Sequence, residues 1–183
     1  MFLILFGPPG IGKGTQSEKI SSDFNIPKIS TGDILRQAIE SGTHLGLSAK
    51  KLMDNGDLVP DEIVLGIVEH RIGEDDCKNG FILDGFPRTI PQARGLTDLM
   101  DSLNFPPCKC IELQVPDEII IERLLIRGRN DDTEETIRKR LQIYKNQTKP
   151  VKGYYRENNN FFQVDGNKPI DDVYQDLKAI VAS

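Results

Sequence analysis

The sequence contains little cysteine and little histidine: of its 183 residues, three are cysteine and two are histidine. Cys77, Cys108 and Cys110 do not form the paired CxxC spacing of a zinc site, and an odd set does not make a disulfide framework. Cys108 and Cys110 are two residues apart, which places them on one face of a strand. His44 and His70 lie far from the motifs described below, so we expect them at the surface. These shortages argue against zinc and redox chemistry and favour a reducing compartment.

Positive charge is also in deficit. The chain has 23 lysine and arginine residues against 28 acidic residues, a net charge of -5. A nucleic-acid or anionic-membrane surface needs clustered positive charge, so we expect neither kind of partner. No apolar run reaches membrane-spanning length, and the strand pattern begins at the first residues. We therefore expect a cytoplasmic protein without a signal or transit segment.

Short apolar runs alternate with helical patterns along the chain. We expect strands at Phe2–Phe6, Pro27–Ser30, Phe81–Asp84, Lys109–Val115 and Phe161–Val164. Helical patterns cover Lys13–Asp23, Thr31–Ser41, Leu45–Asn55, Asp61–Ile72, Ile90–Leu103, Asp117–Ile126, Thr133–Glu157 and Ile170–Ala182. This alternation predicts an α/β fold with a five-stranded parallel sheet covered by helices on both faces. Ligands of such sheets bind at the carboxyl ends of the strands.

The most informative motif follows the first predicted strand and reads GPPGIGKGT, from Gly7 to Thr15. Gly-x-x-x-x-Gly-Lys between a strand and a helix is the pattern of a phosphate-binding loop. Its glycines permit backbone angles that let N–H groups converge on phosphate oxygens, and Lys13 adds a positive charge. The common form of the pattern has a hydroxyl residue directly after the lysine. Here Gly14 takes that place and the hydroxyl comes one residue later, at Thr15.

A second motif, FILDGFPR, begins with the strand that ends at Asp84. A carboxylate in this position beside a phosphate loop is suited to orienting magnesium or its waters. Arg88, placed after a Gly-Phe-Pro turn, is suited to bidentate phosphate binding. Taken alone, Asp-Gly after a strand is equally compatible with an ordinary turn.

Arginines are concentrated between residues 123 and 140. Arg123 and Arg127 are four residues apart, which places them on one helical face, and Arg129 follows Gly128. We expect Arg138 and Lys139 to lie on a solvated helical face. Phosphoryl transfer needs positive charge from several directions, because the oxygens of the migrating group carry the transition-state charge. No nucleophile triad is present, and an acceptor that is already an ionised phosphate needs no general base.

Together these motifs resemble the adenylate kinase family. The resemblance rests on Gly7–Thr15 with Gln16, on STGD at residues 30–33 with Arg36, on DGFPR at residues 84–88, and on Asp131-Asp132 through RKRL at residues 138–141. It extends to VDGNKP at residues 164–169 and so covers the whole chain. Gly-Lys-Gly-Thr is the form of the loop that this family has. The resemblance implies one P-loop kinase domain, with core residues 1–30, 60–126 and 132–183, an AMP-binding insert at 31–59 and a minimal lid at 127–131.

The resemblance further implies reversible transfer of the terminal phosphoryl group of Mg-ATP to AMP, giving two ADP, by a monomer. The implied catalytic residues are Lys13, Asp84, Arg88, Arg129 and Arg140. The implied ATP-binding residues are Gly10, Ile11, Gly12, Lys13, Gly14, Thr15, Arg123, Arg127 and Lys168. The implied AMP-binding residues are Thr31, Arg36, Asp57, Leu58, Val59, Gly85, Phe86, Pro87, Arg88, Gln92, Arg129 and Arg140. Magnesium would be held by the nucleotide phosphates, with Asp84 and Thr15 as outer-shell partners, and the chain has no structural metal ligand.

Two other functions fit parts of the sequence. One is a UMP/CMP kinase of the same family, but those relatives typically have alanine where Thr31 stands and asparagine in the stretch after Arg88. Here the chain has Thr31 and Gln92, and a glutamine amide pairs with the adenine edge, so AMP is favoured. The other is a non-catalytic nucleotide-binding regulator. The complete set of Lys13, Asp84, Arg88, Arg129 and Arg140 argues against loss of catalysis.

The lid departs from the family pattern. Family members have a loop or a small subdomain between the residues that match Arg127 and Arg129, whereas only Gly128 separates them here. Long lids that bind zinc use cysteines, and this segment has none, so a structural zinc is excluded.

A short lid excludes water from the transfer site less completely, and excluded water strengthens phosphate contacts and suppresses hydrolysis. We predict a higher ratio of ATP hydrolysis to phosphoryl transfer than in long-lid relatives. Measuring both rates side by side in one assay tests this, and equal ratios would contradict it.

Overall fold

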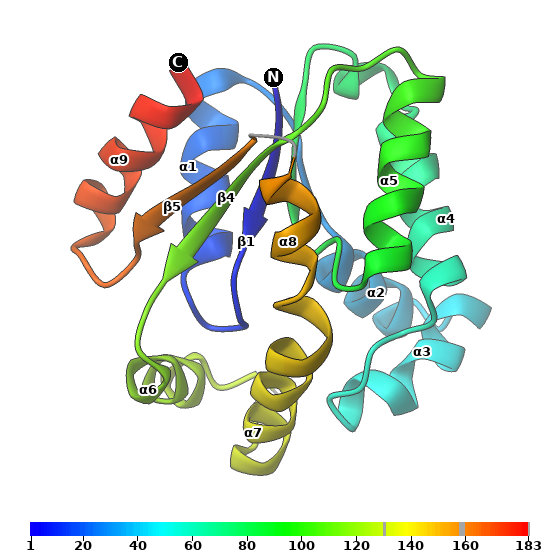
Figure 1. The fold of residues 1–183 in the computed structure, drawn as a ribbon. Coiled ribbons are helices and arrows are strands. Elements are labelled where there is room, and N and C mark those ends of the chain that lie inside the picture. The colour runs from blue at the N-terminus through cyan, green and yellow to red at the C-terminus, as the bar shows by residue number, and fades with distance from the viewer. Residues whose placement is uncertain (130, 158–159, 183) are drawn as a thin grey trace.

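Five parallel strands form a single sheet in the computed structural model, which describes residues 1–129, 131–157 and 160–182. The strands are β1 (Phe2–Phe6), β2 (Lys28–Ser30), β3 (Phe81–Asp84), β4 (Lys109–Gln114) and β5 (Phe161–Asp165). Their order is β2-β3-β1-β4-β5, and every neighbouring pair is parallel. Helices cover both faces (Figure 1). The predicted α/β fold is confirmed.

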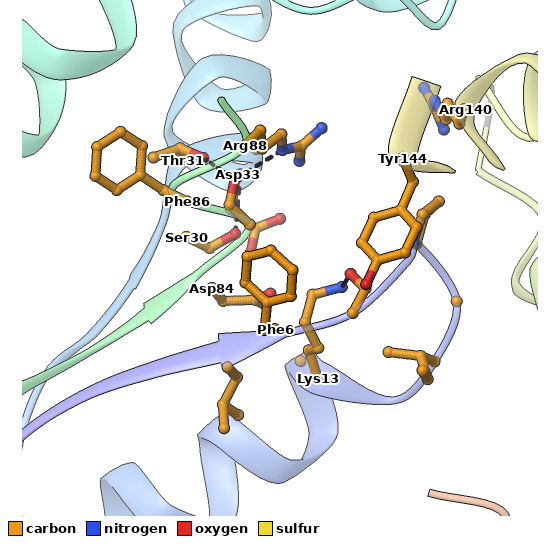
Figure 2. A pocket seen from close by; sticks show the side chains of 18 of the residues that line it. Phe6, Lys13, Ser30, Thr31, Asp33, Asp84, Phe86, Arg88, Arg140 and Tyr144 are labelled. Atoms are coloured by element: carbon orange, nitrogen blue, oxygen red, sulfur yellow. Dashed lines mark hydrogen bonds between the residues drawn. The ribbon is translucent and has the colours of Figure 1, made fainter. Parts of the chain in front are cut away.

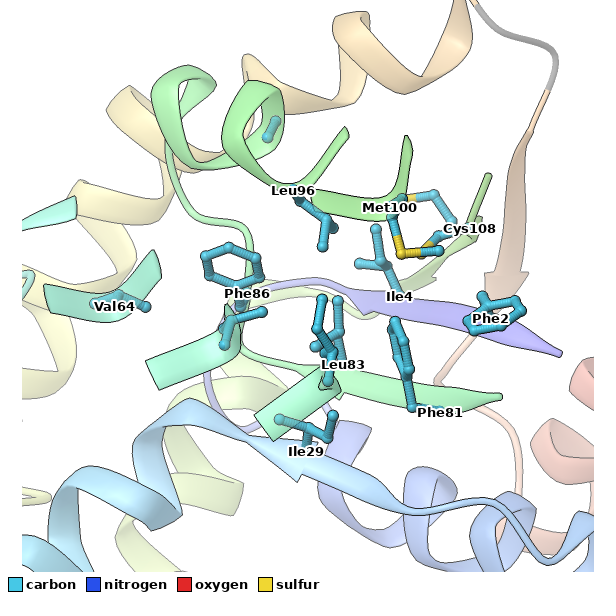
Figure 3. Packing of buried hydrophobic residues seen from close by; sticks show 14 of the residues in the cluster. Phe2, Ile4, Ile29, Val64, Phe81, Leu83, Phe86, Leu96, Met100 and Cys108 are labelled. Atoms are coloured by element: carbon cyan, nitrogen blue, oxygen red, sulfur yellow. The ribbon is translucent and has the colours of Figure 1, made fainter. Parts of the chain in front are cut away.

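The alternation of side chains along β1 divides the core into two layers. Phe2, Ile4 and Phe6 lie in one buried cluster, while Leu3 and Leu5 lie in another. The first cluster packs under α4 (Asp61–Ile72), α5 (Ile90–Ser102) and α8 (Val151–Arg156), as Figure 3 shows in part. The second packs under α1 (Lys13–Phe24) and α9 (Ile170–Ala182). Because both faces of β1 are buried, a continuous apolar run is what this central strand requires.

The cysteines belong to the core. Cys77, Cys108 and Cys110 are buried in the first cluster, and the last two share one face of the sheet as predicted. Burial raises the pKa of the Cys108 thiol to about 12, which keeps it protonated and unreactive near neutral pH.

The segment between β2 and α4 leaves the sheet and forms two helices, α2 (Thr31–Glu40) and α3 (His44–Asp54). Side-chain hydroxyls cap both helices: Ser30 accepts from the Asp33 N–H, and Thr43 accepts from the Gly46 N–H. Gly46 also permits the close packing of the pair, because a Cβ there would lie 2.1 Å from the Ala38 carbonyl oxygen. The predicted pair of helices with no strand between them is confirmed.

The connection between α6 (Asp117–Arg127) and α7 (Glu134–Ile143) is very short. Gly128 ends α6 in the left-handed conformation, with φ at 61°, and a capping box at Thr133 and Thr136 starts α7. A small apolar cluster of Ile120, Leu124, Ile137 and Leu141 joins the two helices. Asn130, which belongs to the predicted lid at 127–131, lies outside the described residues.

The prediction of one helix over Thr133–Glu157 is wrong. The structure divides this stretch into α7, a π-helical turn η2 (Tyr144–Thr148) and α8. Pro150 is the reason, because proline has no N–H to donate and its ring clashes with the carbonyl four residues earlier. Within the described part of the chain, the structure has no helix with the length and apolar character needed to cross a bilayer.

Candidate active site

One cavity of about 640 Å³ opens at the carboxyl ends of the strands. The loop between β1 and α1, the turn after β3, the helix pair α2–α3 and the α6–α7 connection all contribute to its wall. Figure 2 shows part of it, with Lys13, Asp84, Arg88 and Arg140 on different elements. The structure brings together every site residue that the sequence predicts, from the phosphate loop to Lys168 and from Thr31 to Gln92.

Glycine conformations shape the loop between β1 and α1. Gly10 and Gly12 have φ angles of 81° and 101°, which favour glycine. At Gly10 space is also limiting, because a Cβ would lie 2.5 Å from Leu124 Cγ. The loop closes around the side chain of Lys13, whose Nζ donates to the carbonyl oxygens of Gly7 and Pro8, each at 2.9 Å. This is the strand, loop, lysine and helix arrangement of a phosphate-binding loop.

Burial lowers the pKa of Lys13 from 10.5 to about 8. The charge of Asp84 opposes this shift, whereas Arg88 and Arg127 add to it. The Lys13 ammonium therefore lies in a partly desolvated environment with neighbouring positive charges. An anion with several negative charges would stabilise it.

The turn after β3 holds Arg88 rigidly. Gly85 has a φ of 78°, and its carbonyl oxygen accepts from Arg88 Nε at 2.7 Å and from Thr31 Oγ1 at 3.3 Å. The peptide bond between Phe86 and Pro87 is cis. Burial lowers the pKa of Arg88, and the charge of Asp84 partly offsets that effect. The Arg88 guanidinium lies in the cavity wall, where an anionic ligand would therefore stabilise its charge.

Asp132 organises the arginines of the lid region, and its side chain is 0% exposed. Arg127 binds it with two hydrogen bonds of 2.8 and 2.7 Å, and Arg140 Nη1 donates to it at 3.2 Å. The backbone N–H of Arg129 donates to the same carboxylate at 3.3 Å. Arg140 also pairs with Asp131. One buried carboxylate thus fixes three segments whose arginines face the cavity.

Helix α7 also contacts the insert. Arg140 Nη2 donates to the Met53 carbonyl oxygen at 3.2 Å, and Lys139 forms an ion pair of 2.6 Å with Asp57. Arg138 agrees with the predicted solvated face: its side chain is 65% exposed and pairs with Glu134. Lys139 is half-exposed as expected, but its ion pair links it to a predicted AMP-binding residue.

At the insert end, Gln92 is 1% exposed and both ends of its amide are engaged. Its Oε1 accepts from the Arg88 N–H at 2.7 Å, and its Nε2 donates to Asp61 Oδ1 at 2.7 Å. At the opposite end, Arg123 Nη1 donates to the Gly166 carbonyl oxygen at 3.4 Å. Lys168 lines the same end, and its Nζ pairs with Asp176 at 2.7 Å.

Sequence reasoning missed the two carboxylates that position other site residues. Asp132 belongs to an acidic run that also marks the start of a helix, and Asp61 likewise begins α4. Acidic residues are common in a first helical turn, so their second role has no local pattern. The hydrogen bonds and full burial of the Asp132 side chain become visible only in the folded chain.

A dedicated metal site is absent from the described part of the chain, which has no group of three or more His, Cys, Asp or Glu side chains able to hold an ion. A magnesium ion bound here would take most of its ligands from phosphates and water. Asp84 fits that arrangement, because it lines the cavity beside the phosphate loop and Mg²⁺ bound with nucleotides commonly uses one or two carboxylates.

The fold and the cavity define a P-loop nucleotide-binding protein in which several cationic side chains line one cavity. The family model described as adenylate kinase matches residues 5–160. Adenylate kinase 1 of a Synechocystis species is 50% identical, over 98% of this chain and 96% of that protein. An adenylate kinase of Methanosarcina barkeri is 44% identical, over 99% and 98%, and one of Leptospira biflexa is 51% identical, over 90% of each chain. The chain belongs to the adenylate kinase family.

The relatives differ in length within the matched region. The match to the Methanosarcina barkeri protein extends over 211 positions, more than the 183 residues of this chain, so that relative has additional residues. The match to the Synechocystis protein extends over 179 positions. The family therefore includes members close to this chain in length.

The lowered pKa of Lys13 predicts how activity depends on pH. As pH rises through about 8, the free protein loses the ammonium charge, so kcat/KM for ATP should fall. Bound phosphates favour the protonated amine, so kcat should decline only at higher pH. Initial-rate profiles measured across this range check both expectations.

Lys13→Arg is the control, because a guanidinium does not titrate in this range and any remaining activity should show no decline near pH 8. A wild-type kcat/KM that stays constant to about pH 10 would contradict the assignment, since free lysine itself titrates there.

Proposed function

We propose that this cavity binds ATP and AMP at opposite ends and transfers the terminal phosphoryl group of ATP to AMP, giving two ADP, in a reversible reaction. One observation carries the proposal. Lys13, Arg88, Arg129 and Arg140 come from separate segments and line one cavity, with the phosphate loop on one side and the α2–α3 insert on the other. Such convergent positive charge suits a group whose oxygens carry negative charge in the transition state.

The donor would occupy the half formed by the phosphate loop, α6 and the turn after β5. Gly10–Thr15 would surround the ATP phosphates, with Lys13 next to the migrating group. Arg123, held near the Gly166 carbonyl oxygen, would pack against the adenine, and Lys168 lines the same end. Arg127, fixed by Asp132, would contact the phosphates.

The acceptor would occupy the half formed by α2, α3 and the turn after β3. Thr31, Arg36, Gly85 and Gln92 line this half, together with residues 57–59 and 86–88. Arg36 would bind the AMP phosphate, and its present partner is Asp33. Arg88, Arg129 and Arg140 would bind phosphates from both nucleotides, since they lie between the two halves.

The chemistry follows from charge and position. The attacking oxygen belongs to the AMP phosphate, which is ionised near neutral pH and needs no base. Lys13 and the arginines would hold the two phosphates in line and stabilise the charge that develops on the migrating group. The carboxylates of Asp131 and Asp132 keep the guanidinium groups of Arg127 and Arg140 in position before the nucleotides bind. Little rearrangement of these groups is then needed at the moment of transfer.

Magnesium fits the residues that are present. Bound to the ATP phosphates, it would neutralise their charge, and Asp84 with Thr15 would hold its waters. The nucleotides ATP, AMP and ADP are the substrates and products of this family. We further infer a cytoplasmic monomer that binds neither nucleic acid nor membrane, in agreement with the charge of -5. The relatives described above are adenylate kinases, so they give no support to a UMP/CMP preference.

Replacing Arg88 by lysine tests the proposal. Arg88→Lys keeps the charge but removes the planar fork that binds phosphate bidentately, so we expect a loss of about 1–3 kcal/mol in transition-state binding, or roughly ten- to a hundredfold in kcat/KM. The rate of ADP formation from ATP and AMP measures it.

Arg138→Lys is the matched control, because this side chain is exposed and pairs with Glu134 one turn earlier in its own helix. It should change the rate less than about twofold. Equal effects of the two substitutions would contradict the role of Arg88, and no ADP formation by the wild type would contradict the function itself.

A further inference from the structure

A closed ring of hydrogen bonds surrounds the amide of Gln92, where α4 and α5 lie side by side (Figure 1). Asp61 Oδ1 accepts from Gln92 Nε2 at 2.7 Å, and Asp61 Oδ2 accepts from Thr89 Oγ1 at 3.0 Å. Thr89 Oγ1 in turn accepts from the Gln92 N–H at 3.2 Å, which caps α5. Gln92 Oε1 accepts from the Arg88 N–H at 2.7 Å. Asp61 thus connects the start of α4 to the amide that faces the cavity.

The partners fix which end of the Gln92 amide is which. A carboxylate can only accept, so the end facing Asp61 must be the NH₂ group. A backbone N–H can only donate, so the end facing Arg88 must be the oxygen. If the amide were rotated by half a turn, two acceptors would face each other at Asp61 and two donors at Arg88. Each mispaired buried group is costly, so the amide is held in one orientation.

A fixed amide can distinguish purines that a freely rotating amide could not. After these two bonds, Gln92 retains one N–H and one oxygen lone pair. Adenine presents an acceptor at N1 beside a donor at its 6-amino group, which matches a donor and an acceptor in that fixed order. A 6-oxopurine presents the reverse order, a donor at N1 beside an acceptor at O6. It would pair only with the rotated amide.

We propose that Asp61 is a specificity-determining positioning residue, which holds the Gln92 amide in the orientation that accepts adenosine monophosphate and rejects monophosphates of 6-oxopurine nucleosides. This inference rests on the proposed function, in which the base of the acceptor lies against Gln92. Asp61 acts through Gln92 and touches no reacting atom.

Asp61→Asn tests the inference with AMP and inosine monophosphate as alternative acceptors. Asparagine can still accept from Gln92 Nε2, so kcat/KM for AMP should remain within a few-fold of wild type. The asparagine amide can also rotate and donate to Gln92 Oε1. A Gln92 amide turned by half a turn would then still be correctly paired at residue 61. We expect kcat/KM for inosine monophosphate to rise by about tenfold, the equivalent of one buried mispairing relieved. A gain with the poor substrate is a result that general structural damage does not produce.

Two matched variants serve as controls. Asp61→Glu keeps an acceptor-only carboxylate and should show no gain with inosine monophosphate. Glu62→Gln changes the charge equally at the adjacent exposed position and should leave both rates unchanged. If Asp61→Asn does not fold, Asp61→Ser takes its place, because a serine hydroxyl both donates and accepts. It should likewise raise kcat/KM for inosine monophosphate relative to kcat/KM for AMP.

The outcomes separate the two proposals. Suppose that the wild type phosphorylates AMP normally, but that Asp61→Asn and Asp61→Ser leave the ratio of kcat/KM for inosine monophosphate to kcat/KM for AMP unchanged. That result would overturn the role of Asp61 alone. A parallel loss with both acceptors would also overturn it, because it would show only a structural contribution. Failure of the wild type to phosphorylate AMP would overturn the proposed function, and this inference with it.

Discussion

Repulsion among cations is the constraint on which the site depends. Lys13, Arg88, Arg127, Arg129 and Arg140 line one cavity, and such a group of like charges opposes folding unless something offsets it. Carboxylates provide the offset: Asp132, which is buried, binds Arg127 and Arg140, Asp131 binds Arg140, and the charge of Asp84 opposes the lowering of the pKa values of Lys13 and Arg88. The compensation is incomplete, since the pKa values of Lys13, Arg88 and Arg129 remain below their usual values, mainly through burial. We propose that the positive charge left in this cavity attracts polyanionic nucleotides.

The topology of the sheet and the helices attached to it bring these charges together. Parallel strands have their carboxyl ends at the same edge of the sheet, and β1 and β3 are neighbours, so the loop after β1 lies next to the turn after β3. The α2–α3 insert and the α6–α7 connection then form the two remaining walls, and α7 joins them through Lys139 to Asp57 and Arg140 to Met53. Because α7 contacts the insert directly, the two walls of this cavity are linked even with only Gly128 between Arg127 and Arg129. Relatives as different in length as the Methanosarcina barkeri and Synechocystis proteins share the same family.

Most of the architecture could be predicted from the sequence, because local patterns determine it. The strands β1 and β3 and the helices α4 and α9 agree with expectation at both ends, since short apolar runs mark the strands and a proline directly precedes each of the two helices. The prediction of one long helix over Thr133–Glu157 is wrong because the apolar periodicity continues past Pro150, and the effect of this proline on the backbone outweighs that periodicity. The motifs also identified residues that the structure gathers in one cavity. What they could not identify is how those residues are held: the contacts of Asp132 and Asp61 cross between elements and leave no trace in local spacing.

The most direct measurement is a crystal structure with two adenosines joined through a polyphosphate chain. We expect one adenosine beside Arg123 and Lys168, the other beside Thr31 and Gln92, and the linking phosphates within hydrogen-bond distance of Lys13, Arg88, Arg129 and Arg140. If one adenosine lay outside the cavity, or if Arg88 and Arg140 bound none of the phosphates, the assignment of two nucleotides meeting at these cations would be contradicted.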